Sequence, residues 1–309
     1  MLPRELEPIA PGVWAWVQQD GTWWVNNAGL IAGDDGDVLV DTCATLARTR
    51  ELLAAIDTAR PGARLRWAVN THAHGDHTHG NCLLPAETTI ISHPATRRAL
   101  VDDIVIEQCP PFWDPVPDWG GAVKRLPELL TASADIVTGQ RTVEIRHPGF
   151  AAHTDGDLIT WLPDAGVLFA GDLVFNGLTP LVFMGSVPGA RDALDWLAGF
   201  SPDVLVPGHG PVLRASAITA ELDRQRRYYD FVASIGEDAL RRGSGPLEAA
   251  SRADLGDFAH WADSERLVMN LHRYLADARG RHSNRWRRSP TPSPGRAPPC
   301  PRPYSGENR

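Results

Sequence analysis

The sequence lacks any long hydrophobic run and any excess of positive charge. No apolar stretch in its 309 residues approaches the roughly 18 to 20 residues that a membrane helix requires, so we expect a soluble protein. The formal net charge is -8 and the isoelectric point is about 5.7, which argues against a nucleic-acid or anionic-membrane partner. An acidic ligand would therefore need a local positive site, and a metal centre would supply one.

Two further absences limit the class of protein. Residues 1–11 carry acids and prolines instead of the basic and apolar regions of a secretory signal peptide, so a cytoplasmic location is the default expectation. The four cysteines are widely spaced and form no C-x-x-C pair, which argues against a disulfide framework or a thiolate zinc knuckle. We interpret them as small buried residues, with a reactive thiol as the less favoured alternative. They are Cys43, Cys82, Cys109 and Cys300.

The sequence does contain a mixed order of strands and helices, which predicts an α/β protein of packed sheets with helices outside. A core is expected over residues 1–214, and a helical extension that packs on it over residues 215–279. From residue 280 to 309 the composition shifts to Arg, Pro and Ser, which predicts a disordered tail. Apolar runs predict core strands at 12–17, 23–32, 38–40, 65–69, 89–92, 143–146, 158–161, 167–170 and 204–206, and helices at 44–59, 94–106 and 190–198.

A stretch rich in proline and tryptophan interrupts this pattern between Gln108 and Gly121. Its prolines exclude a regular helix. Long irregular loops often form lids over binding sites. Two interpretations stay open: a lid, or aromatic side chains that only pin a surface loop to the core.

The strongest chemical feature is a dense histidine cluster directly after the predicted strand at 65–69. Between His72 and His79, four histidines and one aspartate occupy eight positions. Neutral imidazole and carboxylate groups are standard zinc ligands, and a loop that leaves a strand end can turn successive side chains toward one point. The cluster therefore predicts a metal site. We expect His79 itself to lie outside the ligand set, either close behind the ligands or facing solvent.

Three more acid and imidazole positions follow near the ends of apolar runs or in glycine-bearing turns: His153, Asp172 after a glycine, and His209 between two glycines. Each alone is a weak signal, because a single such residue is more often a turn or capping residue. Their order along the chain, after the cluster, is much more specific.

The order His-x-His-x-Asp-His, a lone His, Gly-Asp and Gly-His-Gly resembles the signature of the metallo-β-lactamase superfamily, over about residues 12–212. The resemblance implies an αββα sandwich with the metals at one edge. Asp41 matches the family's early aspartate and is expected to support the loop without binding metal. By the resemblance, one metal is bound by His72, His74 and His153, the other is bound by Asp76, His77 and His209, and Asp172 bridges the two.

This ligand set implies hydrolytic chemistry with two Zn²⁺ ions. Two zinc ions about 3.5 to 4 Å apart can activate water at neutral pH and polarise a substrate carbonyl. Asp76 is also expected to act in catalysis, by orienting the attacking group. Asp172, where true β-lactamases commonly show Cys or another residue, favours the thioesterase-like branch of the superfamily. The resulting nitrogen and oxygen ligand set suits iron or manganese as well.

A narrower resemblance rests partly on segments outside the metal motif. These segments are similar to the metallo-β-lactamase-type cyclases (cyclase/thioesterase) of bacterial aromatic (type II) polyketide biosynthesis, a route to antibiotics, and the similarity runs from about residue 8 to 278. It implies aldol cyclisation and dehydration of a polyketide, bound to an acyl carrier protein or free, with or without thioester hydrolysis. The segments are Trp24–Gly29, Phe175–Pro180, Met184–Val187, Ala253–Phe258 and Glu265–Arg273.

Aromatic side chains supply candidate walls for a flat substrate, with simple apolar packing as the equal alternative. The candidates are Trp113, Trp119, Phe175 and Phe183. The same metal ligands would also serve a general hydrolase of thioesters or lactones, like glyoxalase II, and this second hypothesis needs no cyclase activity. A non-catalytic binding module is disfavoured because every ligand position is filled. Spacing assigns no general acid, and it leaves open the native metal, the ring that is closed and the oligomeric state.

Overall fold

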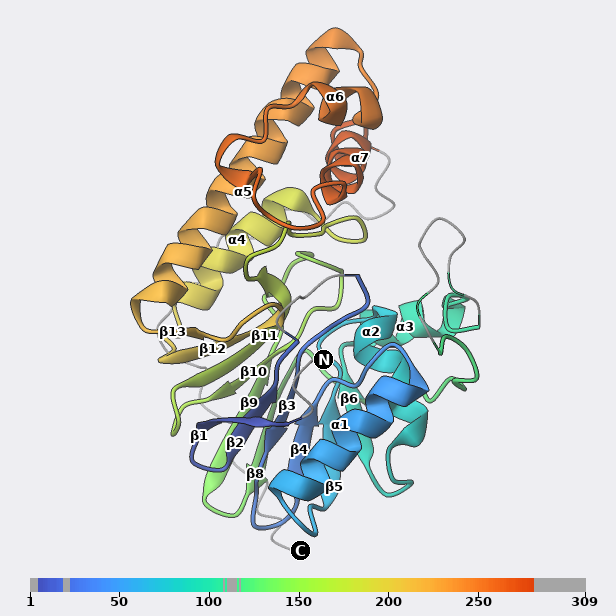
Figure 1. Ribbon diagram of the computed structural model, residues 1–309, viewed down its shortest axis with the longest axis vertical. Helices are drawn as coiled ribbons and strands as arrows, with labels where there is room; N and C mark the ends of the chain where they lie inside the picture. The colour runs from blue at the N-terminus through green and yellow to red at the C-terminus, as the bar shows by residue number, and fades with distance from the viewer. Residues whose placement is uncertain (1–4, 19–22, 108, 110–115, 117, 281–309) are drawn as a thin grey trace, which may run out of the picture.

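The computed structural model describes residues 5–18, 23–107, 109, 116 and 118–280. Two β-sheets pack face to face, with helices on both outer sides (Figure 1). This is the αββα arrangement that the sequence predicts. The predicted tail beyond Gly280 and most of the predicted lid loop lie outside the described residues.

The first sheet contains seven strands that follow one another in chain order. Strands β1 to β4 pair antiparallel, whereas β4 to β7 pair parallel. The carboxyl ends of β4, β5 and β6 therefore meet at one edge of the sheet. The strands are β1 (Glu7–Ala10), β2 (Val13–Trp16), β3 (Ala28–Ile31), β4 (Asp37–Val40), β5 (Leu65–Val69), β6 (Thr89–Ser92) and β7 (Leu129–Leu130).

The second sheet contains six strands in the order β13-β12-β11-β10-β9-β8. One pair, β11 and β12, is parallel, and the other pairs are antiparallel. The strands are β8 (Ser133–Thr138), β9 (Arg141–Arg146), β10 (Ile159–Leu162), β11 (Val167–Phe175), β12 (Val204–His209) and β13 (Leu213–Arg214).

Alternation of side chains along the strands builds the four layers. On β4, Val38 and Val40 point into the core between the sheets, whereas Leu39 points toward the outer helices. On β11, Phe169 joins the same inner core and Leu168 points outward. Both strands are apolar on both faces because each is covered on both sides.

Helix α1 (Leu46–Ala59) covers the outer face of the first sheet, where Leu52 and Ile56 pack against it. The short helices α2 (Gly75–Thr78) and η1 (His79–Leu83) follow β5, and α3 (Pro94–Asp102) follows β6. The predicted helix to Ile106 is therefore too long. Asp103 ends it, because its carboxylate accepts the N–H of Val105, an alternative to continuing the helix.

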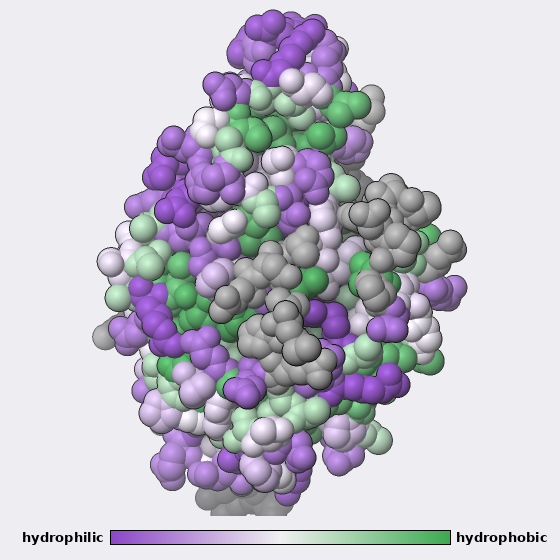
Figure 2. All heavy atoms as spheres, viewed as in Figure 1, coloured by the Kyte–Doolittle hydropathy of each residue, from purple (hydrophilic) through white to green (hydrophobic). Residues whose placement is uncertain are grey.

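The outer face of the second sheet is covered by α4 (Val187–Ala198) and by the long C-terminal helix α5 (Ser216–Arg242). The long helix α5 projects beyond the sheets, and the other helices pack against its far end (Figure 1). In the same view, hydrophilic side chains cover the tip of this projection (Figure 2). The helices are α5 (Ser216–Arg242), α6 (Pro246–Arg252), η2 (Gly256–Phe258) and α7 (Arg266–Ala278).

The predicted and the observed strands differ in two ways. The strand predicted over 23–32 is confined to β3, because Trp24 has a positive φ of 63° and the side chain of Asn27 bonds main-chain carbonyls of another segment. Strand β8 is missing from the prediction because it lies at a sheet edge and alternates weakly between exposed and buried residues. In the described part of the chain, the structure contains no helix that is both long and apolar enough to cross a membrane.

Candidate metal centre

The predicted ligands come together at one edge of the sandwich. His72, His74 and His77 follow β5, and His209 is the last residue of β12. In open sheets, ligands bind where the carboxyl ends of parallel strands meet, and β5 and β12 each pair parallel with a neighbouring strand. Asp172 joins them from within β11.

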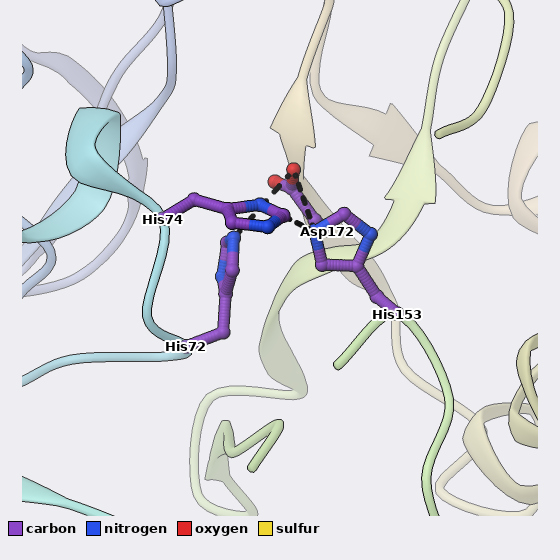
Figure 3. Close-up of side chains that lie close together, drawn as sticks. All are labelled: His72, His74, His153 and Asp172. Atoms are coloured by element: carbon purple, nitrogen blue, oxygen red, sulfur yellow. Dashed lines mark hydrogen bonds and ion pairs between the residues drawn. The ribbon is translucent and has the colours of Figure 1, made fainter. Parts of the chain in front are cut away.

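The ligand atoms form two groups, each with all its atoms within 4.8 Å of one another. All these residues are buried except His74, which is partly exposed. Figure 3 shows the first group, in which the imidazole rings and the carboxylate converge from three segments. The groups are His72, His74, His153 and Asp172, and Asp76, His77 and His209.

Asp172 lies between the two groups. Its Oδ2 is 3.4 Å from Nε2 of His153 in the first group and 3.3 Å from Nε2 of His209 in the second. Its Oδ1 is 3.1 Å from Nε2 of His77. One carboxylate thus reaches both groups, which is the position that a bridging ligand requires.

In four of the histidine rings, a hydrogen bond at the nitrogen that faces away from the centre sets the orientation of the ring. In each ring Nδ1 is occupied and Nε2 faces the centre, the usual arrangement behind metal-binding histidines. Carbonyl and carboxylate oxygens only accept, so Nδ1 carries a proton in three of these rings, and Nε2 has a free lone pair whenever the ring is neutral. The Nδ1 partners are Oγ1 of Thr71 for His72 (3.0 Å), Oδ2 of Asp41 for His77 (2.8 Å), the carbonyl of Leu181 for His153 (2.7 Å) and the carbonyl of Val25 for His209 (2.9 Å).

His74 is oriented the other way round. Its Nδ1 lies 2.9 Å from Nε2 of His153, whereas its Nε2 lies 3.3 Å from Sδ of Met184. Its ring stacks on Phe183, with ring centroids 5.4 Å apart and an angle of 6° between the planes. His74 therefore presents Nδ1, not Nε2, to the group.

Unpaired buried atoms show that the residues fit a metal ion. Among the described residues, Nε2 of His72, Nε2 of His77 and Oδ1 of Asp172 are buried and have no hydrogen-bond partner. Leaving such an atom unpaired costs about 1 to 3 kcal/mol. A cation bound in each group would offset that cost, and imidazole and carboxylate groups are suitable donors.

Burial and the neighbouring carboxylates shift the pKa values of the rings in opposite directions. Burial lowers the pKa of His72 and His74, and it lowers the pKa of His153 to about 3, so these rings are neutral at pH 7. Burial alone would also lower the pKa of His209, but the carboxylates of Asp172 and Asp76 outweigh it and raise that pKa to about 9. A cation in the second group therefore has to displace a proton.

Asp41 lies behind the histidine loop, as expected. It follows β4 with a positive φ of 62°, a conformation that Asp tolerates better than most residues. Its carboxylate accepts the N–H of Thr71 at 2.7 Å, the hydroxyl of Thr71 at 2.7 Å and Nδ1 of His77 at 2.8 Å. Asp41 thus holds the start of the loop and the ring of His77 together.

Steric crowding requires a glycine directly before His209 in the sequence. A Cβ atom at Gly208 would lie 1.9 Å from Oδ1 of Asp172, much closer than two atoms can approach. Gly210, after His209, has a φ of 88°, and a Cβ there would lie 2.0 Å from the carbonyl oxygen of Asn176. The Gly-His-Gly motif therefore lets β12 lie directly against the carboxylate of Asp172.

His79 lies outside both groups, but it is buried and does not face solvent. Its Nε2 is 2.8 Å from Oδ2 of Asp103, and its ring meets the edge of Trp119. It also packs against Gly75, where a Cβ would lie 2.2 Å from the ring. His79 thus braces the loop that carries the ligands.

A small pocket opens above the two groups, with a cavity volume of about 50 Å³. Phe175 and Phe183 line it, as predicted, but Trp119 is not among its lining residues and Trp113 lies outside the described residues. Sequence reasoning missed other lining residues. The missed residues are Trp23, Trp24, Leu181 and Arg266.

Arg266 belongs to the segment Glu265–Arg273, which supports the narrower resemblance, but no role was predicted for it. A lone arginine at the start of a helix carries no signal in the sequence. Only the packing of α7 brings it to the pocket.

Comparison with known proteins agrees with this geometry. Residues 21–209 match the family described as the Metallo-beta-lactamase superfamily. The chain belongs to this superfamily. It is also 27% identical, over 262 residues, to the 2,4-dinitroanisole O-demethylase subunit alpha of Nocardioides sp., a match that covers 82% of this chain and 70% of that protein.

Two further similarities show how far the likeness extends. The chain is 28% identical over 190 residues to the acyl-coenzyme A thioesterase MBLAC2 of Homo sapiens, covering 51% of this chain and 65% of that protein. The structure of the sec-alkylsulfatase Pisa1 from Pseudomonas sp. is similar with a TM-score of 0.66 at 19% identity, covering 88% of this chain and 50% of that one. The latter similarity concerns the fold alone.

Proposed function

We propose that this superfamily member is a metal-dependent hydrolase that acts on the carbonyl of acyl thioesters. The observation that carries the proposal is the position of Asp172 between two groups of buried imidazoles, at the floor of a pocket with apolar walls. The similarity to an acyl-coenzyme A thioesterase supports thioesters as the substrate class.

In this proposal the two groups hold two Zn²⁺ ions. His72, His74 and His153 would bind the first, and Asp76, His77 and His209 the second, with Asp172 shared. Bound zinc supplies a lowered pKa for water and a positive charge that polarises the substrate carbonyl.

Asp76 has a second role that depends on its own charge. It lines the pocket, and its Oδ2 lies 3.3 Å from Nε2 of His209. Burial would raise its pKa, but the neighbouring His77 and His209 outweigh burial and hold that pKa below its usual range. Asp76 therefore stays ionised and accepts a hydrogen bond from the attacking water molecule, which orients its oxygen toward the carbonyl.

The walls of the pocket suit the acyl part of a substrate. Phe175, Leu181 and Phe183 present apolar surface beside the ligand groups. Such surface binds an acyl chain and excludes bulk water, so charges inside the pocket interact more strongly.

A second candidate is ring closure of an aromatic polyketide, and one observation favours it. The segment Glu265–Arg273, which resembles the polyketide cyclases, shapes the pocket. Arg266 lines it, and the side chain of Asn270 accepts the N–H of Val182 at 2.6 Å and donates to the carbonyl of Pro180 at 2.8 Å.

In that reaction the carbon next to the polarised carbonyl loses a proton. The resulting enolate forms a carbon–carbon bond with a second carbonyl of the same chain, and water then leaves. An acyl carrier protein as partner and a cytoplasmic location belong to this second candidate.

One experiment separates the two candidates. Zinc-loaded protein is incubated with simple acyl thioesters and with a carrier-bound, partly cyclised polyketide, and products are followed by mass spectrometry. Release of free acid from simple thioesters supports the hydrolase. Loss of one water with the chain still on its carrier supports the cyclase instead.

Variants of the ligand groups serve as controls for both reactions. Asp76→Ala and His72→Ala should each lower turnover by more than about a hundredfold while the chain stays folded. His93→Ala is the matched control, because His93 caps α3, stacks on His147 and belongs to neither ligand group. Full turnover in Asp76→Ala or His72→Ala protein of known metal content would refute the role of the two groups.

A further inference from the structure

The side chain of Arg266 reaches the pocket of the metal centre from outside the sandwich. Arg266 is the first residue of α7, yet it lines the pocket together with Asp76 and Asp172. It is only 2% exposed. A guanidinium is rarely buried so completely unless it is paired.

Two arms of the guanidinium are held by the protein. One terminal nitrogen, Nη1, donates to the carbonyl of Thr179 at 2.9 Å, and Nη2 lies 2.9 Å from Oδ2 of Asp263. The plane is further held by two aromatic rings, with Cζ 4.5 Å from the ring centre of Trp23 and 5.6 Å from that of Phe175. The orientation of Arg266 is therefore set before any ligand arrives.

The third nitrogen of the guanidinium makes no hydrogen bond. Among the described residues, Nε of Arg266 has no hydrogen-bond partner, although it is buried. An arginine held only for structure is expected to have its buried donors paired, because a buried unpaired donor costs free energy. An unpaired charged donor beside a pocket is instead typical of a site that awaits an anionic oxygen.

We propose that Arg266 binds an anionic oxygen of the substrate, a carboxylate or an enolate, at a distance from the carbonyl that reacts. This inference rests on the proposed function for the reacting carbonyl and adds the substrate class: acyl compounds that carry a second, negatively charged oxygen group. Arg266 belongs to neither ligand group, so the anion that it binds is a different part of the substrate from the part at the metals.

Equilibrium binding tests the inference without any turnover. Zinc-loaded protein is titrated calorimetrically with succinate, adipate and suberate, and with butyrate, hexanoate and octanoate as matched monocarboxylates. We expect at least one diacid to bind about tenfold more tightly than its monoacid. Arg266→Met should abolish this advantage and leave the affinity for the monoacid within about twofold.

Two further variants make the result specific. Arg266→Lys keeps the positive charge without the planar donor and should restore part of the diacid advantage, which also covers the case that Arg266→Met fails to fold. Arg273→Met is the matched control, because Arg273 lies on the same helix, is ion-paired with Asp277 and does not line the pocket. Its diacid advantage should equal that of the unmodified protein.

The inference is overturned if no diacid has an advantage, if the advantage persists in Arg266→Met, or if that variant weakens monoacids and diacids equally. The last result would show a structural role. Turnover of N-acetylcysteamine thioesters, whose thiol part is uncharged, separates this outcome from the proposed function. Adipoyl thioester should exceed hexanoyl thioester in kcat/KM by about tenfold, and only with Arg266 intact.

If no thioester is cleaved but the diacid advantage depends on Arg266, the hydrolase proposal fails and the anion site stands. If both thioesters are cleaved equally well with and without Arg266, the anion site fails and the hydrolase proposal stands.

Discussion

Nδ1 of His77 lies 2.8 Å from Oδ2 of Asp41, and the same carboxylate accepts two hydrogen bonds from Thr71. Asp41 thus ties the end of β4 to both ends of the loop that carries the ligands. A neutral side chain of the same shape would keep the local backbone but lose the charge behind His77.

Asp41→Asn should weaken zinc binding about 10- to 100-fold, because the second oxygen and the negative charge that orient His77 are lost. The measurement is competition with a chelator of known affinity. Asp37→Asn is the matched control at the other end of β4. Asp37 accepts hydrogen bonds from Arg60 and Arg64, so its loss should lower the free energy of unfolding by about 1 to 3 kcal/mol and leave zinc affinity unchanged. Equal zinc affinity of Asp41→Asn and the unmodified protein would contradict the supporting role.

Gly208→Ala should displace the carboxylate of Asp172, because the new Cβ would lie 1.9 Å from Oδ1. We expect reduced metal content, measured by elemental analysis, and a loss of about 1 to 3 kcal/mol in the free energy of unfolding. Gly245→Ala is the control, since a Cβ at Gly245 meets nothing within 4 Å. Full metal content in Gly208→Ala would show that Asp172 does not need its observed position.

Zinc binding should depend on pH differently in the two groups. In the metal-free chain, burial would lower the pKa of His209 but Asp172 and Asp76 raise it to about 9, whereas burial lowers the pKa of His153 to about 3. Zinc must therefore displace a proton from His209 at pH 7 but none from His153. Burial would also lower the pKa of His77, but the carboxylates of Asp172, Asp41 and Asp76 outweigh it and hold that pKa well above its usual value. Zinc must therefore displace a proton from both rings of the second group. Because fewer protons compete as pH rises, affinity at the second group should increase by more than about tenfold per unit from pH 6 to 9.

Affinity at the first group should change little over that range. Calorimetric titrations in buffers of different ionisation enthalpy measure the protons released. His209→Ala should remove part of that release, because His77 also gives up a proton. Equal proton release on filling either group would show that the carboxylates do not set the difference.

His79→Ala should destabilise the fold without removing a ligand. His79 is buried and its Nε2 lies 2.8 Å from Oδ2 of Asp103, so the variant removes the imidazole partner of that oxygen and opens a cavity. We expect a loss of about 2 to 4 kcal/mol in the free energy of unfolding with the number of bound zinc ions unchanged. Loss of a zinc ion at unchanged stability would instead make His79 a ligand.

The sequence by itself determined which residues gather and at which edge. The loop from His72 to His77 follows an apolar run that can only be a buried strand, and side chains so close in sequence must lie close in space. The parallel strands β4 and β5 were readable as apolar runs because both of their faces are covered. These features depend on residues that are near one another in the chain.

Only the tertiary structure decided how those residues face one another. That His74 presents Nδ1 follows from its contacts with Met184 and Phe183, more than a hundred residues away. That Asp172 reaches both groups follows from the pairing of β11 with β12, where Gly208 makes room for its carboxylate.

The buried Arg266 reaches the pocket only because α7 packs against α5 and α6. No spacing along the chain encodes these relationships, since each depends on packing between segments that the sequence keeps far apart. Local patterns therefore determined the ligands and their strands, and long-range packing decided the geometry of the pocket.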